Sequence, residues 1–170
     1  LAESERLTES KISFFHFVDE ENQKVHINTW SEKAKKDCAV KKHEIIYDLD
    51  KAGIWADCVR MRKPLIHNDY SSIGHKKGLP EGHIKIVREL VVPVFEGERI
   101  VAVLGVGNKP FDYNDMDVEI VNELAKMAWD ILGKKNAEDK LKQSQKSLKT
   151  LIDNLPGIVF SAGIGKDLSL

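Results

Sequence analysis

The side chains most able to do chemistry follow a short apolar segment near the middle of the chain. Leu65 and Ile66 form a predicted strand, and His67, Asn68 and Tyr70 come almost directly after it. Polar and aromatic groups gathered at the mouth of a sheet are typical of small-molecule pockets. We find no nucleophile–base pair and no metal-ligand spacing beside them. The segment therefore predicts a binding pocket rather than an active site.

Other side chains could complete this pocket, and each also has a purely structural interpretation. Trp55 could contact a ligand or pack in the core, and Arg88 could clamp a carboxylate or pair with Glu89 or Asp69. Cys58 is either a packed hydrophobe or a thiol for redox chemistry or cofactor attachment. The predicted pocket comprises Trp30, Trp55, Cys58, His67, Asn68, Tyr70, His83 and Arg88.

The sequence predicts no metal site and no phosphate loop. The six histidines never recur at the i, i+4 spacing of a helical zinc motif, and Cys38 and His43 lack further ligands nearby. Gly105-Val-Gly107 closes a strand, but no helix start follows it, so the context of a dinucleotide fingerprint is missing.

Composition is that of an ordinary water-soluble protein. The 170 residues carry 26 basic and 27 acidic side chains, a balance that gives no basic surface for nucleic acid. No apolar run is long enough to span a membrane, and the first residues do not resemble a signal peptide. We expect a cytoplasmic segment of a longer protein, without direct membrane contact and with reduced cysteines.

The apolar patterns predict a sheet built from two hairpins. Residues 11–18 and 24–30 flank one turn, and residues 88–95 and 99–107 flank another. Both strands of the second hairpin are apolar on both faces, so they should be central. Residues 43–48 could add a third short strand.

Helices and loops are expected between and around these strands. Residues 1–9 resemble the last turns of a helix, and the polar residues 31–38 could form a short helix or a loop. Residues 49–62 have helical spacing, with Ile54, Cys58 and Met61 on one stripe. The long segment 67–83 has turn residues and no period, as functional loops often do.

A long helix should begin after Asn114, which is a good N-cap followed by acidic residues. From residue 137 its apolar positions recur at spacings of four and three, which is typical of a coiled coil. We therefore predict a parallel homodimer. Its seam would comprise Leu132, Leu141, Leu148, Leu151 and Leu155.

Several phrases resemble the GAF domains of archaeal and bacterial sensor histidine kinases. They include Ala52-Gly-Ile-Trp-Ala-Asp-Cys58, Arg62-Lys-Pro-Leu-Ile-His-Asn-Asp-Tyr70 and Arg88-Glu-Leu-Val-Val-Pro-Val94. The resemblance implies an α+β fold, related to PAS domains, with an antiparallel sheet of five to six strands flanked by helices. It also implies a GAF domain over residues 1–133, a connecting coiled coil over 134–155 and an incomplete PAS-like start over 156–170.

The resemblance implies a sensory module that binds a small ligand and signals through its C-terminal helix to downstream PAS and kinase modules. No phosphoacceptor or ATP-binding box is visible, so we expect no enzymatic activity in this segment. Alternatives are a ligand-free dimerisation spacer, a haem- or bilin-binding domain, a cyclic-nucleotide site, and a sulfoxide reductase that uses Cys38 and Cys58.

Overall fold

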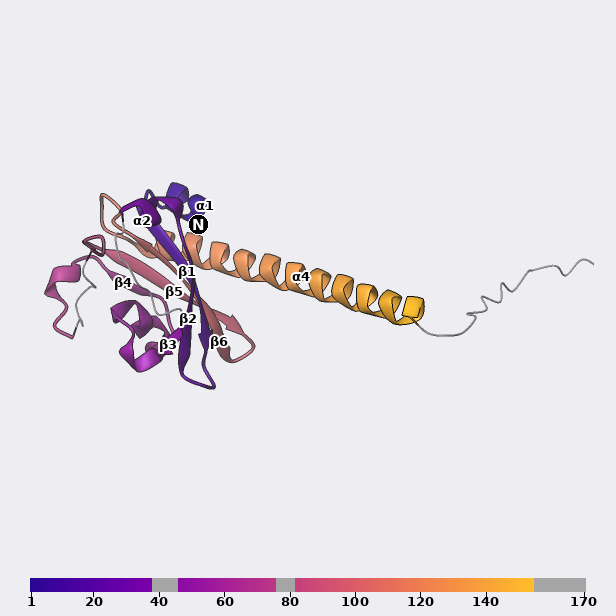
Figure 1. Cartoon of the computed structure of the whole chain (residues 1–170). Coiled ribbons are helices and arrows are strands. Elements are labelled where there is room, and N and C mark those ends of the chain that lie inside the picture. Colours follow the sequence, from indigo (N-terminus) through magenta and orange to yellow (C-terminus); the bar gives the residue numbers. More distant parts are fainter. Residues whose placement is uncertain (38–45, 76–81, 155–170) are drawn as a thin grey trace, which may run out of the picture. The chain divides into compact units, whose positions relative to one another are not determined.

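The computed structural model describes residues 1–37, 46–75 and 82–154, and its centre is a six-stranded antiparallel sheet (Figure 1). The order across the sheet is β3-β2-β1-β6-β5-β4. The strands are β1 (Ile12–Asp19), β2 (Lys24–Trp30), β3 (Ile46–Asp48), β4 (Leu65–His67), β5 (Glu89–Glu96) and β6 (Arg99–Gly107). Both predicted hairpins, β1–β2 and β5–β6, are confirmed, and they meet where β1 pairs with β6.

The helices are α1 (Ala2–Leu7), α2 (Glu32–Asp37), α3 (Asp57–Met61) and α4 (Asp115–Asn154). The single helix predicted for residues 49–62 is wrong, because this segment forms two 3₁₀ turns followed by the short α3. Ala52 and Gly53 between the turns have extended backbones, which interrupts the helical hydrogen bonds. Met61, predicted on the buried stripe, is 56% exposed at the end of α3.

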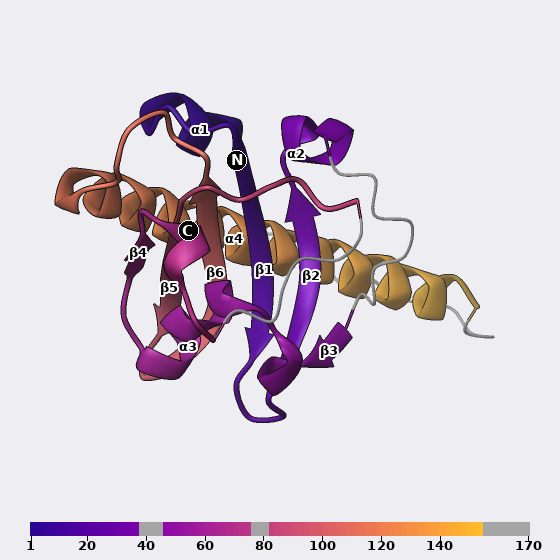
Figure 2. The ribbon, with the colours of Figure 1, turned by 90° about the vertical axis from the view of Figure 1, so that its left-hand side faces the viewer.

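Both faces of the sheet are covered, which explains why its central strands lack an alternating polar pattern. On one face Val91 and Val103 pack with the 3₁₀ turns and α3 in a buried cluster. On the other face lies the first part of α4 (Figure 2). Its Val121 and Ala125 are fully buried, and Trp129 is edge-on to Phe17, with 6.1 Å between the ring centroids. The central position predicted for β5 and β6 is confirmed.

The predicted cap of α4 is confirmed. The Asn114 side-chain oxygen accepts hydrogen bonds from the backbone N–H groups of Met116 (2.9 Å) and Asp117 (3.3 Å). Asp117 in turn accepts from the Asn114 N–H at 3.0 Å, so the two residues form a reciprocal capping box.

The chain divides into two compact units, Leu1–Ile131 and Leu132–Leu170. In the second unit Leu141, Leu148 and Leu151 are each about 60% exposed along α4. Leu155 of the predicted seam and the predicted PAS-like start lie outside the described residues. Among the described helices, none combines the length and the apolar content that crossing a membrane requires.

Candidate ligand-binding site

Strand register places a row of four residues across one face of the sheet. His67 on β4, Glu89 on β5, Gly107 on β6 and Ile12 on β1 are successive cross-strand partners. Because residues two positions apart on a strand share a face, the next row lies beside it. That second row comprises Leu65, Val91, Gly105, Phe14 and Trp30.

The two glycines of β6 make room on this face for the side chains of β1. A Cβ atom on Gly105 would lie 2.3 Å from the Phe14 ring, and one on Gly107 would lie 3.0 Å from the Ile12 side chain. Phe14 and Ile12 can therefore lie flat over β6. This close approach of β1 side chains to β6 forms the floor of a cavity.

Aromatic rings form the walls of this cavity. Phe14 meets Trp55 edge-on at 5.8 Å between ring centroids, and Trp30 meets His83 edge-on at 5.7 Å. The Tyr70 side chain is also buried here. Among the described residues the lining comprises Ile12, Phe14, Trp30, Ala34, Trp55, Tyr70, His83, Ile84, Ile86 and Glu89.

The cavity is small, with a volume of about 70 Å³. Sites for drug-sized ligands have roughly 300–1,000 Å³, and an apolar cavity of roughly 150 Å³ holds benzene. In this conformation the site suits a compact group of few heavy atoms, and a haem or bilin has no room.

Glu89 brings a carboxylate to the apolar cavity. The residue is 6% exposed, and its Oε1 accepts a hydrogen bond from His67 Nδ1 at 3.0 Å. This hydrogen bond raises the pKa of His67 above its ordinary value, although partial burial opposes the shift. Burial, together with the charge of Glu89, raises the pKa of the Tyr70 hydroxyl, which keeps its proton at neutral pH.

A short, well-bonded turn holds Tyr70 against the cavity. Asp69 caps this turn by accepting from the N–H groups of Ser71 (3.0 Å) and Ser72 (3.3 Å). The Tyr70 N–H donates to the Val87 carbonyl at 3.0 Å, which ties the turn to the segment before β5. These bonds fix the backbone that carries the Tyr70 ring.

Four residues of the sequence-predicted pocket line the cavity together: Trp30, Trp55, Tyr70 and His83. His67 lies beside them through its bond to Glu89. Sequence reasoning missed Phe14 and Glu89 as lining residues. Glu89 could have been found as a charged residue at the start of an otherwise apolar strand, but the placement of Phe14 depends on cross-strand register.

The structure gives Asn68 and Arg88 other partners. The Asn68 amide bonds the backbone of Tyr113. Arg88 donates to the Lys109 carbonyl at 2.8 Å and pairs with Asp112 at 3.3 Å, rather than with the predicted Glu89 or Asp69.

Cys58 is fully buried in the cluster beneath α3 rather than at the cavity. Burial raises the pKa of its thiol, with a smaller contribution from the charge of Glu89. A buried, protonated thiol is a poor nucleophile, so this arrangement favours the packed-hydrophobe interpretation. Cys38 and His43 lie outside the described residues.

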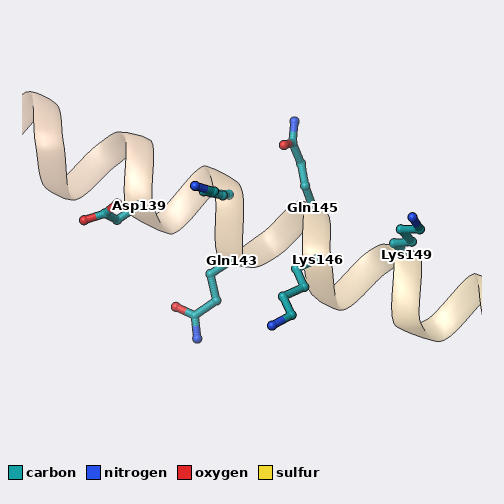
Figure 3. Close-up of a pocket in the computed structure, with 6 residues that line it drawn as sticks. Asp139, Gln143, Gln145, Lys146 and Lys149 are labelled. Atoms are coloured by element: carbon teal, nitrogen blue, oxygen red, sulfur yellow. The ribbon is translucent and has the colours of Figure 1, made fainter.

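A second hollow lies along α4, where Figure 3 shows side chains that project from a single helix. Every residue that lines it is exposed, and none comes from a second element. A surface of this kind cannot surround a small molecule, so we place the candidate site at the aromatic cavity. The described residues contain no cluster of three metal-ligating side chains.

The described residues form a small α+β domain with an aromatic cavity, and its family follows from a sequence comparison. The family model of the GAF domain matches residues 1–133. The chain therefore belongs to the GAF domain family. It is 38% identical over 141 residues to a protein described as a methyl sulfide methyltransferase-associated sensor from Methanosarcina acetivorans. That match covers 82% of this chain but only 14% of the relative.

Solved structures share the fold at low sequence identity. The GAF domain of an Acinetobacter phosphoenolpyruvate-protein phosphotransferase superposes with a TM-score of 0.63 at 17% identity, covering 80% of this chain and 79% of that one. A free methionine-R-sulfoxide reductase from Neisseria meningitidis has a TM-score of 0.53 at 16% identity, covering 74% of this chain and 68% of that one. These likenesses show the fold alone.

Proposed function

We propose that this GAF domain is a sensory module in which a ligand in the aromatic cavity alters the start of α4. The observation that carries the proposal is a double hydrogen bond between Asn68 and Tyr113. Asn68 Nδ2 donates to the Tyr113 carbonyl at 3.0 Å, and the Tyr113 N–H donates to Asn68 Oδ1 at 2.7 Å. Asn68 directly follows His67, and Tyr113 lies two residues before α4 begins.

The groups at both ends of this link are tightly held. At the cavity, His67 bonds Glu89. At the helix, the buried Tyr113 hydroxyl bonds Ser10 at 2.7 Å, and burial raises the pKa of Tyr113 to about 12, so the hydroxyl stays neutral. Buried polar networks have few alternative arrangements, so a displacement of His67 should move Asn68 and Tyr113 with it.

The Tyr113 segment is in turn anchored to the first turn of α4. Lys109 Nζ lies 2.7 and 2.8 Å from the two carboxylate oxygens of Asp117, and Asp117 caps the helix. A ligand changes this region only if it binds two arrangements with different affinities. The contacts offer a short physical path for such a difference.

The downstream part of the proposal draws on the relative, which is named as a sensor. We extend that role to this chain as one module of a cytoplasmic sensor histidine kinase, followed by a PAS domain and without catalytic activity of its own. The exposed leucines of α4 support homodimerisation, because an isolated helix would leave this apolar seam in water.

A ligand-free dimerisation spacer is the second candidate function. The small volume of the cavity favours it, because the side chains of the protein already fill most of the space. A spacer predicts that no small molecule binds at the aromatic walls.

An NMR screen of a metabolite library against the chain separates these functions. The sensory proposal predicts a compound that shifts the indole N–H signals of Trp30 and Trp55 and also the amide signals of Tyr113 and Asp117. In Asn68→Ala the indole shifts should persist while the Tyr113 and Asp117 shifts shrink. Binding without any response at Tyr113, or a library without a single binder, would contradict the proposal.

A further inference from the structure

The described walls of the cavity combine aromatic rings with one carboxylate and contain no lysine or arginine. We infer that the cavity selects a compact organic cation whose charged atom carries methyl groups, as in a quaternary ammonium ion. This inference rests on the proposed sensory function and names the class of ligand for the same site.

The rings supply the first part of the argument. Phe14 and Trp55 meet at 71°, and Trp30 and His83 meet at 64°, so the lining rings form walls at steep angles to one another. The face of an aromatic ring carries negative potential, and rings arranged around a cation are the usual way in which proteins hold methylated ammonium groups.

The Nδ1 atom of His83 donates to the Ile84 carbonyl at 2.8 Å, because a carbonyl oxygen can only accept. This bond orients the imidazole ring as a fixed wall beside Trp30. The wall does not require a positive charge on His83, so it is compatible with a cation in the cavity.

Glu89 supplies the second part of the argument. Its residue is among the described lining, its carboxylate is buried, and Oε1 accepts a hydrogen bond from His67. An anion there would meet a like charge in a poorly hydrated site, whereas a cation would stabilise the carboxylate.

The basic residue next to Glu89 in the sequence does not compensate its charge. Arg88 donates to the carbonyls of Lys109 (2.8 Å) and Pro110 (3.1 Å) and pairs with Asp112. These contacts hold the guanidinium among residues that do not line the cavity. Arg88 therefore does not neutralise Glu89. His67 is the basic group that bonds Glu89, and above the pKa of His67, where the imidazole is neutral, the pair keeps the negative charge of the carboxylate for a ligand.

The size of the cavity and its hydrogen-bonding groups further restrict the class of ligand. A cation with several N–H groups needs an acceptor for each, and Glu89 is the one carboxylate among the described lining residues. A methylated cation needs no such acceptors and gains from contact with apolar walls. A cavity of about 70 Å³ is smaller than one that holds benzene, so it would take the methylated head group alone, with the lining rings displaced outward and the rest of the ligand outside.

Calorimetric titration of the chain with three probes tests this inference. The probes are tetramethylammonium, choline and dimethylbutanol, the uncharged carbon analogue of choline. We expect choline to bind at least about tenfold more tightly than dimethylbutanol, because only choline carries the charge. Tetramethylammonium should compete with choline for one site.

Matched variants assign the site. Glu89→Gln keeps the shape of the side chain and should remove most of the preference for choline over dimethylbutanol. Trp55→Leu should lower the affinity of the chain for both choline and dimethylbutanol. Glu96→Gln, an exposed acid on the same strand, should leave both affinities unchanged. Circular dichroism and the unfolding midpoint of each variant show that its fold is retained.

The outcomes separate this inference from the sensory function. Equal affinities for choline and dimethylbutanol, or a choline preference that survives in folded Glu89→Gln, would overturn the cation assignment. Failure of both cations to bind would also overturn it. The sensory function would still stand if the NMR screen found a neutral or anionic compound that acts at Trp55 and Tyr113.

Discussion

At the scale of single residues, the pair formed by His67 and Glu89 connects the chemistry of the cavity to protein stability. The hydrogen bond to a buried carboxylate favours the protonated imidazole, and this raises the pKa of His67. The same carboxylate is the charge that we assign to ligand recognition. The pair can therefore be studied without a ligand.

The pair predicts a defined pH dependence of stability. Because the folded pKa of His67 is raised, its contribution is fully present below the unfolded value of about 6.5 and is lost as pH rises through the folded value. The difference in unfolding free energy between the wild type and His67→Gln should be about 1 kcal/mol at pH 6 and should shrink toward pH 8.

Urea denaturation at several pH values measures this difference, and its pH dependence should vanish in the Glu89→Gln background. A difference that grows with pH would show that His67 is not stabilised as a cation.

Gly105 gives a second prediction at this scale. In Gly105→Ala the new methyl group must displace the Phe14 ring, since the two would otherwise be 2.3 Å apart. We expect a loss of about 1–3 kcal/mol in unfolding free energy and altered Trp55 fluorescence. Gly133→Ala is the control, because a Cβ there meets nothing within 4 Å. It should raise helix stability by up to about 1 kcal/mol. Equal effects of the two substitutions would refute the close approach.

Sequence reasoning reached part of the site at the residue scale. Trp30, Trp55, Tyr70 and His83 stood out as aromatic or polar side chains near strands and loops, and the structure gathers them at one cavity. Phe14 was missed because its position over Gly105 depends on the pairing of β1 with β6, which local patterns do not specify.

At the scale of elements, hydrophobic periodicity predicted the strands better than the short helices. The β5–β6 hairpin has a clear turn between two apolar runs, and the structure confirms it. Pro93 has no backbone N–H to donate, and β5 tolerates it because it lies beyond the residues that pair with β4. The register shift between Val94 and Phe95 follows closely. The prediction of one helix over residues 49–62 was wrong because the spacing of apolar residues does not reveal the break at Ala52 and Gly53.

The link between elements could not be predicted from local sequence. Asn68 and Tyr113 are 45 residues apart, and only the folded sheet brings the end of β4 to the segment before α4. Asn68 was singled out as a ligand contact, whereas its amide group bonds two backbone atoms of Tyr113. Its position suits transmission better than recognition.

At the scale of the whole molecule, the exposed leucines of the second unit predict self-association. The double substitution Leu141→Glu and Leu148→Glu should shift the chain from dimer to monomer in light scattering at micromolar concentration, because charges would enter the apolar seam. Gln143→Glu with Thr150→Glu adds the same charge away from the seam and should remain dimeric. A wild type that is monomeric throughout would rule out the coiled coil.

The family and the α+β fold were accessible from sequence phrases, and the match over residues 1–133 establishes the family. The chain spans 14% of its sensor relative, so the larger assembly stays a proposal. Sequence phrases identify a fold because packing constrains many positions at once. The ligand depends on a few side chains, which vary between members of one family.

A double-mutant cycle of Glu89→Gln and Asn68→Ala, read at the Tyr113 amide signal by NMR, tests the central claim most directly and needs no ligand. If the cavity is coupled to α4 through Asn68, Glu89→Gln alone should change the chemical shift of the Tyr113 amide. The same substitution should change it much less in a chain that already carries Asn68→Ala. A Tyr113 chemical shift that is unchanged by Glu89→Gln, or that changes equally with and without Asn68→Ala, would contradict this coupling.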